Sequence, residues 1–174
     1  ATVHGVPAVM PGFAAQAQTR AQELGLKNYT GIAAPAEKLP FDDNSFDVVT
    51  CQTVLIHVAD VPKALQEALR VLKPGGLFCA AEPNNLACSL VNLSMYPQIP
   101  WSERSALLDF QHTCEAGKIA LGRGDSSVGD ALPYLFRQAG LQSIQVYSND
   151  KCADLVPPYD RPDQKLDLDQ WLSW

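Results

Sequence analysis

The chain has 174 residues, of which 47% are hydrophobic and 18% charged, and its 13 basic and 19 acidic side chains give a net charge of −6. This balance excludes the broad basic surface that nucleic acids and anionic membranes attract, so neither is expected as a partner. No apolar run reaches the roughly 18 residues of a membrane span, and the five cysteines show no CxxC spacing. We therefore expect a cytoplasmic protein with reduced thiols.

The first part of the chain alternates between strand-like and helix-like segments. Thr2–Val6 is short and β-branched, which predicts a strand. Apolar residues at helical spacing predict a helix over Phe13–Leu24, and Gly25 ends it. Tyr29–Ala33 predicts a second short strand, followed by a proline-bounded loop at 35–40.

The middle of the chain carries the clearest helix signal. Phe46–Cys51 is a nearly continuous apolar run, typical of a strand buried on both faces. Asp60 is the expected N-cap of a helix whose apolar residues recur at i, i+4 up to Leu72. A cation, a proline and two glycines at 73–76 end this helix, and Leu77–Ala81 predicts another buried strand.

The remainder of the chain is less regular. Residues 86–127 mix polar and apolar side chains, with helical spacing around Ser102–Gly117, and we interpret them as an inserted cap over a pocket. Ala131–Ala139 predicts a helix that closes at Gly140. Ile144–Tyr147 and Cys152–Val156 are expected to form a closing pair of strands, one of them antiparallel.

This order of elements predicts an α/β fold. Strands that alternate with helices imply a mostly parallel sheet with helices on both faces and right-handed crossovers. The domain is expected to span 1–156, with a C-terminal extension at 157–174. Ligands of such sheets lie outside the carboxyl ends of the strands, which points to the loops at 7–12, 34–41 and 51–60.

Three segments in a fixed order carry a family resemblance. They read AEKLPFDDNSFDVV at 36–49, VLIHV at 54–58 and RVLKPGG at 70–76, with a weaker match, LFRQAGL, at 135–141. In this order and spacing the chain resembles the class I S-adenosylmethionine-dependent methyltransferases, in the ubiquinone-biosynthesis-like branch that acts on small molecules. The resemblance implies a Rossmann-like sheet and S-adenosylmethionine as the cofactor.

The resemblance also implies an incomplete N-terminus. Family members begin with a strand and a glycine-rich loop that are not found in this sequence, and Thr2–Val6 corresponds to their second strand. In the family's strand order 3-2-1-4-5-7-6, the first strand lies between those matched by Thr2–Val6 and Phe46–Cys51. We therefore expect either that an upstream segment is absent from this sequence or that these two strands pair directly.

By the same resemblance, the cofactor contacts the loops that follow three strands. Leu39 and Phe41 offer an apolar wall to an adenine ring, and strand-end carbonyls offer acceptors to an ammonium group. The expected cofactor-binding residues are Pro7, Ala8, Pro35, Ala36, Glu37, Cys51, Gln52 and Thr53.

Two prolines depart from the family pattern. Pro7 stands where family members carry an acid that binds both ribose hydroxyls, and Pro35 stands where they carry an Asp beside the adenine amine. Because a proline side chain accepts no hydrogen bond, we expect this chain to bind S-adenosylmethionine weakly or not at all. Glu37 is the carboxylate in that loop that is a candidate replacement.

His57 is the candidate catalytic residue. The family often has His at this point, near the transferred methyl group or as a general base, and a packed structural histidine is an equal alternative. Glu82 follows a strand, so it either orients a substrate or is a solvated loop acid. Cys51 is expected to be a small buried residue and no nucleophile. His4 and His112 show no metal-ligand spacing, so no metal is predicted.

Two functions from different classes follow. The first is methyl transfer from S-adenosylmethionine to a small-molecule acceptor, which needs in-line positioning and exclusion of water. The second is a non-catalytic methyltransferase-like scaffold or partner protein that has lost cofactor binding, as the two prolines suggest. A nucleotide-cofactor oxidoreductase is a distant third, because its glycine fingerprint is absent from the sequence.

Overall fold

A computed structural model describes residues 2–6, 11–94, 96–147 and 165 of the chain. The chain divides into the units Ala1–Ile144 and Gln145–Trp174. The elements that position the candidate site all belong to the first unit. They comprise strands β1 to β4, helices α1 to α5 and the 3₁₀ turns η1 and η2.

The N-terminal part of the first unit is a parallel strand pair with its crossover helix. β1 (Val3–Gly5) pairs with β2 (Tyr29–Gly31), and α1 (Pro11–Glu23) connects them. A Cβ atom at Gly31 would press into the backbone oxygen of Ala14, so glycine permits the close packing of α1 on β2. Both predicted strands and the predicted helix are confirmed here.

A second parallel pair holds the helix that the sequence predicts best. β3 (Phe46–Gln52) pairs with β4 (Leu72–Ala81), and between them lie η1 (Leu55–His57) and α2 (Val61–Val71). The Asp60 carboxylate accepts a hydrogen bond from the Lys63 N–H at 3.0 Å, which confirms the predicted N-cap. The buried face of α2 consists of Val61, Ala64, Leu65, Ala68 and Val71.

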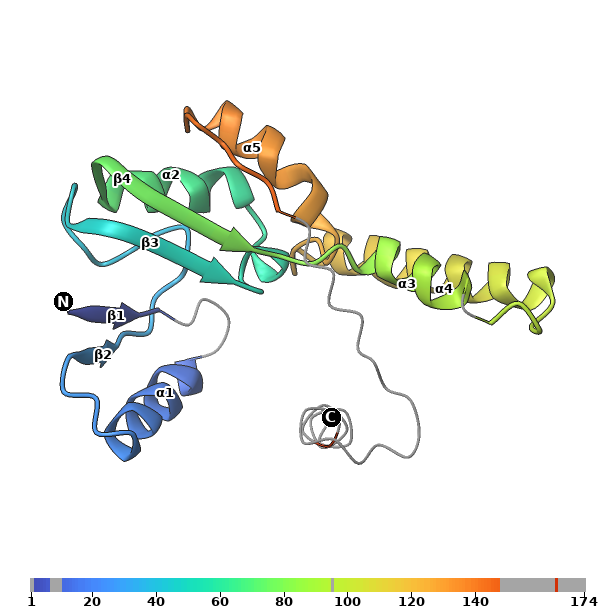
Figure 1. Cartoon of the computed structure of the whole chain (residues 1–174), viewed down its shortest axis with the longest axis horizontal. Coiled ribbons are helices and arrows are strands. Elements are labelled where there is room, and N and C mark those ends of the chain that lie inside the picture. The colour runs from blue at the N-terminus through green and yellow to red at the C-terminus, as the bar shows by residue number, and fades with distance from the viewer. Residues whose placement is uncertain (1, 7–10, 95, 148–164, 166–174) are drawn as a thin grey trace. The chain divides into compact units, whose positions relative to one another are not determined.

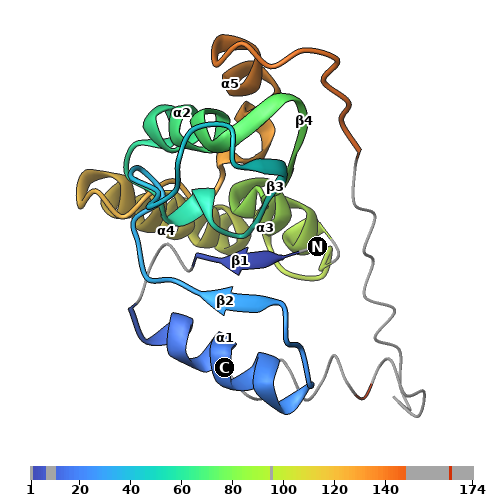
Figure 2. The same ribbon diagram turned by 90° about the vertical axis from the view of Figure 1, so that its left-hand side faces the viewer.

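The two strand pairs remain separate sheets. The order is β1-β2 in one sheet and β3-β4 in the other, so β1 and β3 do not pair directly. In Figures 1 and 2, β1 lies between β2 and the second sheet, and its arrow runs in the same direction as that of β3 in Figure 1. The alternative of direct pairing between these strands is therefore not found, and an open groove separates them.

The prediction that the Phe46–Cys51 strand is buried on both faces is wrong. Asp47, Val48 and Thr50 are exposed, and Val48 retains 51% of its accessible surface. Among the residues that the structure describes, β3 pairs with β4 on one edge and with no strand on the other, which borders the groove. An apolar run shows that a strand can be buried, but the burial depends on neighbours outside the run.

A helical hairpin follows β4. α3 (Asn85–Ser94) and α4 (Trp101–Ala120) pack against each other and project away from the strands (Figure 1). The predicted helical region around Ser102–Gly117 lies inside α4, whereas α3 was not predicted as a separate helix. η2 (Val128–Ala131) and α5 (Leu132–Gln138) follow, which confirms the predicted helix before Gly140.

The predicted strand Ile144–Tyr147 is not formed. Residues 141–147 adopt no regular element, and the side chains of Val146 and Tyr147 are 68% and 82% exposed. No strand of the described residues pairs with this segment, and an extended segment gains little without a ladder partner. The other expected strand, Cys152–Val156, lies outside the described residues.

The main apolar core surrounds η1 and α2. Its buried members are Leu55, Ile56, Val58, Val61, Ala64, Leu65, Val128 and Leu132. Phe78 of β4 and Phe136 of α5 pack against this cluster and meet edge to face, with ring centroids 5.3 Å apart. η1 is therefore part of the main apolar core. None of the helices described is both long enough and apolar enough to cross a bilayer.

Candidate functional site

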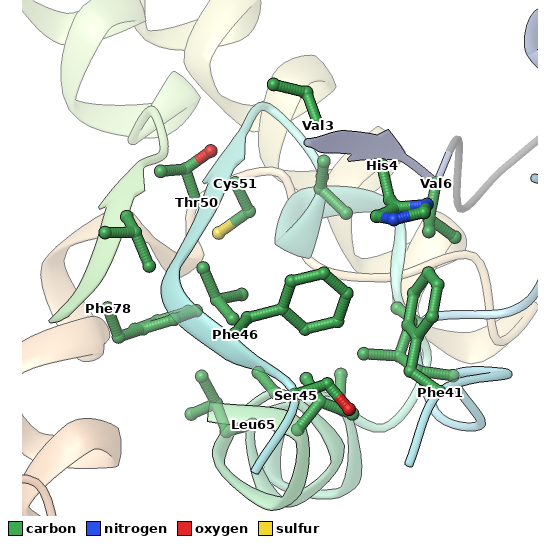
Figure 3. Close-up of a pocket in the computed structure, with 18 of the residues that line it drawn as sticks. Val3, His4, Val6, Phe41, Ser45, Phe46, Thr50, Cys51, Leu65 and Phe78 are labelled. Atoms are coloured by element: carbon green, nitrogen blue, oxygen red, sulfur yellow. The ribbon is translucent and has the colours of Figure 1, made fainter. Parts of the chain in front are cut away.

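The candidate site is the groove between β1 and β3. A cavity of about 640 Å³ lies there, with β1 on one wall, β3 on the other and α2 beneath (Figure 3). Val3 and Val6 line it from β1 and the residue after it, and Leu65 and Val71 line it from α2. The lining is mainly apolar and consists mostly of residues of β1, β3 and α2, because the groove lies where the family's strand order places its first strand. The part at which a ligand of such a sheet is expected is its carboxyl end, at Ala36, Cys51 and Val54.

Three rings meet at one side of this groove. His4 contacts Phe41 and Phe46 edge to face, with centroid distances of 5.4 and 5.7 Å, and the two phenylalanine rings lie 4.9 Å apart (Figure 3). Such edge-to-face pairs stabilise a fixed arrangement by about 0.5–1.5 kcal/mol each beyond area burial. The sequence analysis missed His4, because the residues it meets lie far along the chain.

Arg70 of α2 holds the loop that brings Phe41 to the groove. Its guanidinium donates to the backbone oxygens of Leu39 at 3.0 Å and Phe41 at 2.8 Å. It also pairs with the carboxylates of Glu67 at 2.8 Å and Asp43 at 2.7 Å. The loop is thus fixed through its backbone by a planar cation with several donors, as Arg provides and Lys does not.

Glu67 completes this network. Its carboxylate accepts the Leu39 N–H at 2.8 Å as well as the Arg70 guanidinium. The hydrogen bonds from Arg70, supported by that from Leu39, lower the pKa of Glu67 to about 2. The same pairing raises the pKa of Arg70. The apolar wall predicted at Leu39 and Phe41 therefore rests on an ionic network from α2.

Cys51 lies at the carboxyl end of β3, in the lining of the groove. Burial, followed by the negative charge of the nearby Glu82, raises the pKa of the thiol to about 12. A thiol with this pKa stays protonated at neutral pH and is a poor nucleophile. The prediction that Cys51 is a small buried residue and no nucleophile agrees with this environment.

Only part of the predicted cofactor set lines the groove. Ala36 and Cys51 do so. Pro7 and Ala8 lie outside the described residues. The others are described but do not line the cavity: they are Pro35, Glu37, Gln52 and Thr53. Some residues of the predicted loops at 34–41 and 51–60 therefore line the same groove.

His57 is exposed at the end of η1, so it is not a packed structural histidine. Within the described residues its imidazole makes no hydrogen bond. His57 does not itself line the groove, but Val54 and Leu55 of the same segment do. The side chain is therefore available to a ligand next to the carboxyl end of β3.

Both interpretations of Glu82 need correction. Its carboxylate accepts the N–H groups of Val54 at 2.9 Å and Ile56 at 3.3 Å, so it is neither a free loop acid nor a group open to a substrate. A 3₁₀ turn leaves its first N–H groups without partners, and Glu82 supplies the acceptors. Its position after a strand gave no indication of this role.

The groove suits one half of S-adenosylmethionine better than the other. Leu39 and Phe41 present apolar surface to a flat ring. Among the described lining residues, however, the single carboxylate is Asp47, whose pKa is lowered by its hydrogen bond and charge interaction with Lys73. The described lining thus offers a surface for adenine and no unpaired carboxylate for the ribose hydroxyls. Among the described residues, no group of three His, Cys, Asp or Glu side chains is arranged to hold a metal ion.

Comparison with known proteins finds similarity over the segment that contains this groove. Residues 4–80 match the model of a methyltransferase domain. The ubiquinone/menaquinone biosynthesis C-methyltransferase UbiE of Bartonella quintana is 46% identical over 74 residues, 42% of this chain and 28% of that protein. The mitochondrial 2-methoxy-6-polyprenyl-1,4-benzoquinol methylase of Danio rerio is 40% identical over 86 residues, 47% of this chain and 26% of that protein. The chain thus spans about a quarter of the length of these relatives.

A solved structure supports the fold over a longer stretch. The crystal structure of a candidate methyltransferase from Bacillus halodurans aligns with 80% of this chain and 62% of its own, with a TM-score of 0.55 and 17% identity. At this identity the likeness concerns the fold alone, which is α/β and Rossmann-like. The strands and helices of the first unit therefore follow the arrangement that the resemblance implies.

Proposed function

We propose that this chain, whose residues 4–80 belong to the class I S-adenosylmethionine-dependent methyltransferases of the ubiquinone-biosynthesis-like branch, takes part in methyl transfer to a small-molecule acceptor. The observation that carries the proposal is the carboxyl end of the groove, which is lined by Ala36, Cys51 and Val54 and lies within the matched segment. Ligands of parallel sheets lie at the carboxyl ends of the strands, where Ala36 and Cys51 line the groove, whereas Phe41 packs on Phe46 at the start of β3.

In this proposal the groove holds the cofactor by its adenine end. Ala36, Val54 and the end of β3 at Cys51 lie beside the ring, and the Leu39–Phe41 segment, which Arg70 anchors, holds the loop that carries Ala36. When bound, S-adenosylmethionine supplies an electrophilic methyl group. The protein's part is to align the acceptor with that group and to exclude water.

The acceptor is proposed to lie on the far side of the turn that carries His57. His57 is exposed there, and a neutral imidazole can accept a proton from the acceptor as the methyl group is transferred. Residues 86–127, which include α4 and most of α3, are proposed to form the cap on the acceptor side of the turn, as part of a domain that spans 1–156 with an extension at 157–174. The net charge of −6 argues against nucleic acid or an anionic membrane as partner, and the cytoplasmic location is proposed from the five cysteines without CxxC spacing.

Two relatives suggest the acceptor class to test first. One is named a C-methyltransferase of quinone biosynthesis and the other a benzoquinol methylase. We propose a phenolic or quinol ring as the acceptor. Such a ring has an acidic O–H whose proton His57 can take, and an activated carbon for the methyl group.

The test is a methyl-transfer assay with S-adenosylmethionine and 2-methoxy-6-polyprenyl-1,4-benzoquinol as the probe acceptor. We expect His57→Gln to lower kcat by about 10²-fold or more, the usual contribution of a general base. The matched control is His112→Gln, an exposed histidine on α4, which is expected to leave kcat unchanged. Absence of transfer by the unaltered chain contradicts the proposed function. Equal rates for the two histidine variants contradict the role of His57.

A further inference from the structure

The turn η1, which carries His57, is closed by hydrogen bonds between its own backbone groups. In η1 the His57 N–H donates to the Val54 oxygen at 3.0 Å, and the Val58 N–H donates to the Leu55 oxygen at 3.1 Å. Leu55 and Ile56 retain 4% and 5% of their surface, whereas His57 is exposed. Because its neighbours are anchored in the core, the position of His57 follows that of the turn.

A carboxylate from β4 holds one side of this turn. Both oxygens of Glu82 are used, one for the Val54 N–H at 2.9 Å and one for the Ile56 N–H at 3.3 Å. The Thr53 N–H donates to the Ala81 oxygen at 3.0 Å, so the chain on either side of Glu82 is aligned with the turn. Hydrogen bonds to an ionised group are stronger than those between neutral groups.

An ammonium group from α4 holds the other side. Lys118 Nζ donates to the Ile56 backbone oxygen at 2.8 Å and also to the hydroxyl of Ser126. Lys118 is half-buried and Ser126 retains 6% of its surface, so both contacts are shielded from water. Ile56 is thus bound at its N–H by the anion that follows β4 and at its C=O by a cation of α4.

The segment after α4 packs directly on the backbone of Ile56 and His57. Gly124 has a φ of +85°, and a Cβ atom there would overlap the Ile56 oxygen and the His57 backbone. The Gly129 N–H donates to the Pro83 oxygen at 3.1 Å, which ties the same segment to the residue after Glu82. The turn, the end of β4 and the end of the hairpin therefore form one connected unit.

We propose that Glu82 and Lys118 are positioning residues for methyl transfer, which together clamp the Ile56 peptide groups and so fix His57 relative to the cofactor groove. This inference rests on the proposed function. Neither side chain touches the cofactor or the acceptor in this proposal. Lys118 also links the α3–α4 hairpin to the turn, so that the hairpin and His57 keep a fixed position relative to each other.

The experiment compares four variants of the full chain in the same methyl-transfer assay, with the benzoquinol acceptor as the probe. They are Lys118→Met, Lys118→Arg, Glu82→Gln and the control Lys63→Met, which removes an exposed lysine of α2. Amide hydrogen exchange of residues 54–58 is measured on each variant, and thermal melting identifies any variant that fails to fold.

We expect Lys118→Met and Glu82→Gln to speed exchange of the Val54, Ile56 and Val58 amides and to lower kcat about tenfold, with KM for S-adenosylmethionine within about twofold. Lys118→Arg keeps a cationic donor and is expected to retain more activity than Lys118→Met. Lys63→Met is expected to match the unaltered chain. If Glu82→Gln does not fold, the Lys118 pair decides the outcome.

Three results overturn the proposal. Unchanged exchange in Lys118→Met shows that the clamp does not hold the turn. Faster exchange with unchanged kcat shows a structural role only. No transfer by the unaltered chain removes the proposed function, and the positioning role with it, whereas a failure confined to the Lys118 and Glu82 variants leaves the proposed function standing.

Discussion

The β3–α2–β4 region and the α3–α4 hairpin use opposite arrangements of side chains. α2 turns its apolar residues inward, and Leu65 retains only 1% of its surface. On α4, by contrast, Trp101 and Phe110 are 61% and 68% exposed, while the shielded side includes Glu115 and Lys118. The first region is held by apolar burial, whereas the hairpin is tied to the domain through polar contacts. We therefore expect substitutions in α2 to lower the free energy of unfolding most. Substitutions in the hairpin should instead affect the position of His57.

The substitution expected to have the largest effect on stability is Leu65→Ala. It removes a fully buried side chain from the core around η1, and a loss of about 3–5 kcal/mol in the free energy of unfolding is expected. Leu107→Ala is the matched control, because Leu107 of α4 is 51% exposed and its loss is expected to cost less than about 0.5 kcal/mol. Urea denaturation measures both. Similar losses for the two variants would show that the hairpin is packed as densely as α2.

A pair of glycines tests the junction between the two regions. Gly124 and Gly122 both have positive φ, +85° and +65°, but only at Gly124 would a Cβ atom meet the backbone of the turn. We expect Gly122→Ala to cost about 1–2 kcal/mol from strain alone. Gly124→Ala should cost about 2–4 kcal/mol, because overpacking is added. Equal costs in denaturant melts would indicate that the segment does not press on Ile56.

The Glu67–Arg70 network predicts that the free energy of unfolding depends on pH through the carboxylate of Glu67. The folded-state pKa of Glu67 is lowered to about 2, below the value of about 4.3 in an unfolded chain. Its contribution to stability is therefore present in full above about pH 5 and is lost as the pH falls toward 2. Glu67→Gln should cost about 1–2 kcal/mol at pH 7 and remove this part of the acid sensitivity. Parallel curves of unfolding free energy against pH for the variant and the unaltered chain would contradict the pairing.

The smallest expected effect is at the start of α2. Asp60→Ala removes the side-chain acceptor for the Lys63 N–H and is expected to cost about 1 kcal/mol. Asp60→Asn retains a capping oxygen and should cost only a few tenths of this. Thermal melts of both variants measure the difference, and no loss in Asp60→Ala would show that water replaces the cap.

The sequence predicts those features whose causes lie within one segment. The Asp60 cap, the apolar spacing of α2 and the closing glycine of α1 are local, and each is confirmed. The burial of β3 and the strand at Ile144–Tyr147 were predicted wrongly, because both depend on a neighbouring strand that a local pattern does not specify.

Parts of the candidate site depend on distant pairs and could not be predicted. Lys118 meets the Ile56 carbonyl across 62 residues, and Arg70 meets the Leu39 carbonyl across 31. No residue type or spacing indicates either contact. Ala36 and Cys51 line the groove, as expected of residues in the loops after two strands, although their binding of a cofactor stays a prediction. The role of Glu82 was predicted wrongly, because its partners are backbone N–H groups.

The most direct test of the central claim is calorimetric titration of S-adenosylhomocysteine into this chain and into a Pro7→Asp, Pro35→Asp variant. The cofactor is proposed to lie in the groove, and its weak binding is attributed to the two prolines. We expect weak but saturable binding by the unaltered chain and binding at least about a hundredfold tighter by the variant, since the carboxylates add at least two charge-assisted hydrogen bonds, each worth roughly 1.5–3 kcal/mol. Absence of saturable binding by both proteins up to millimolar ligand would contradict the assignment of the groove as the S-adenosylmethionine site.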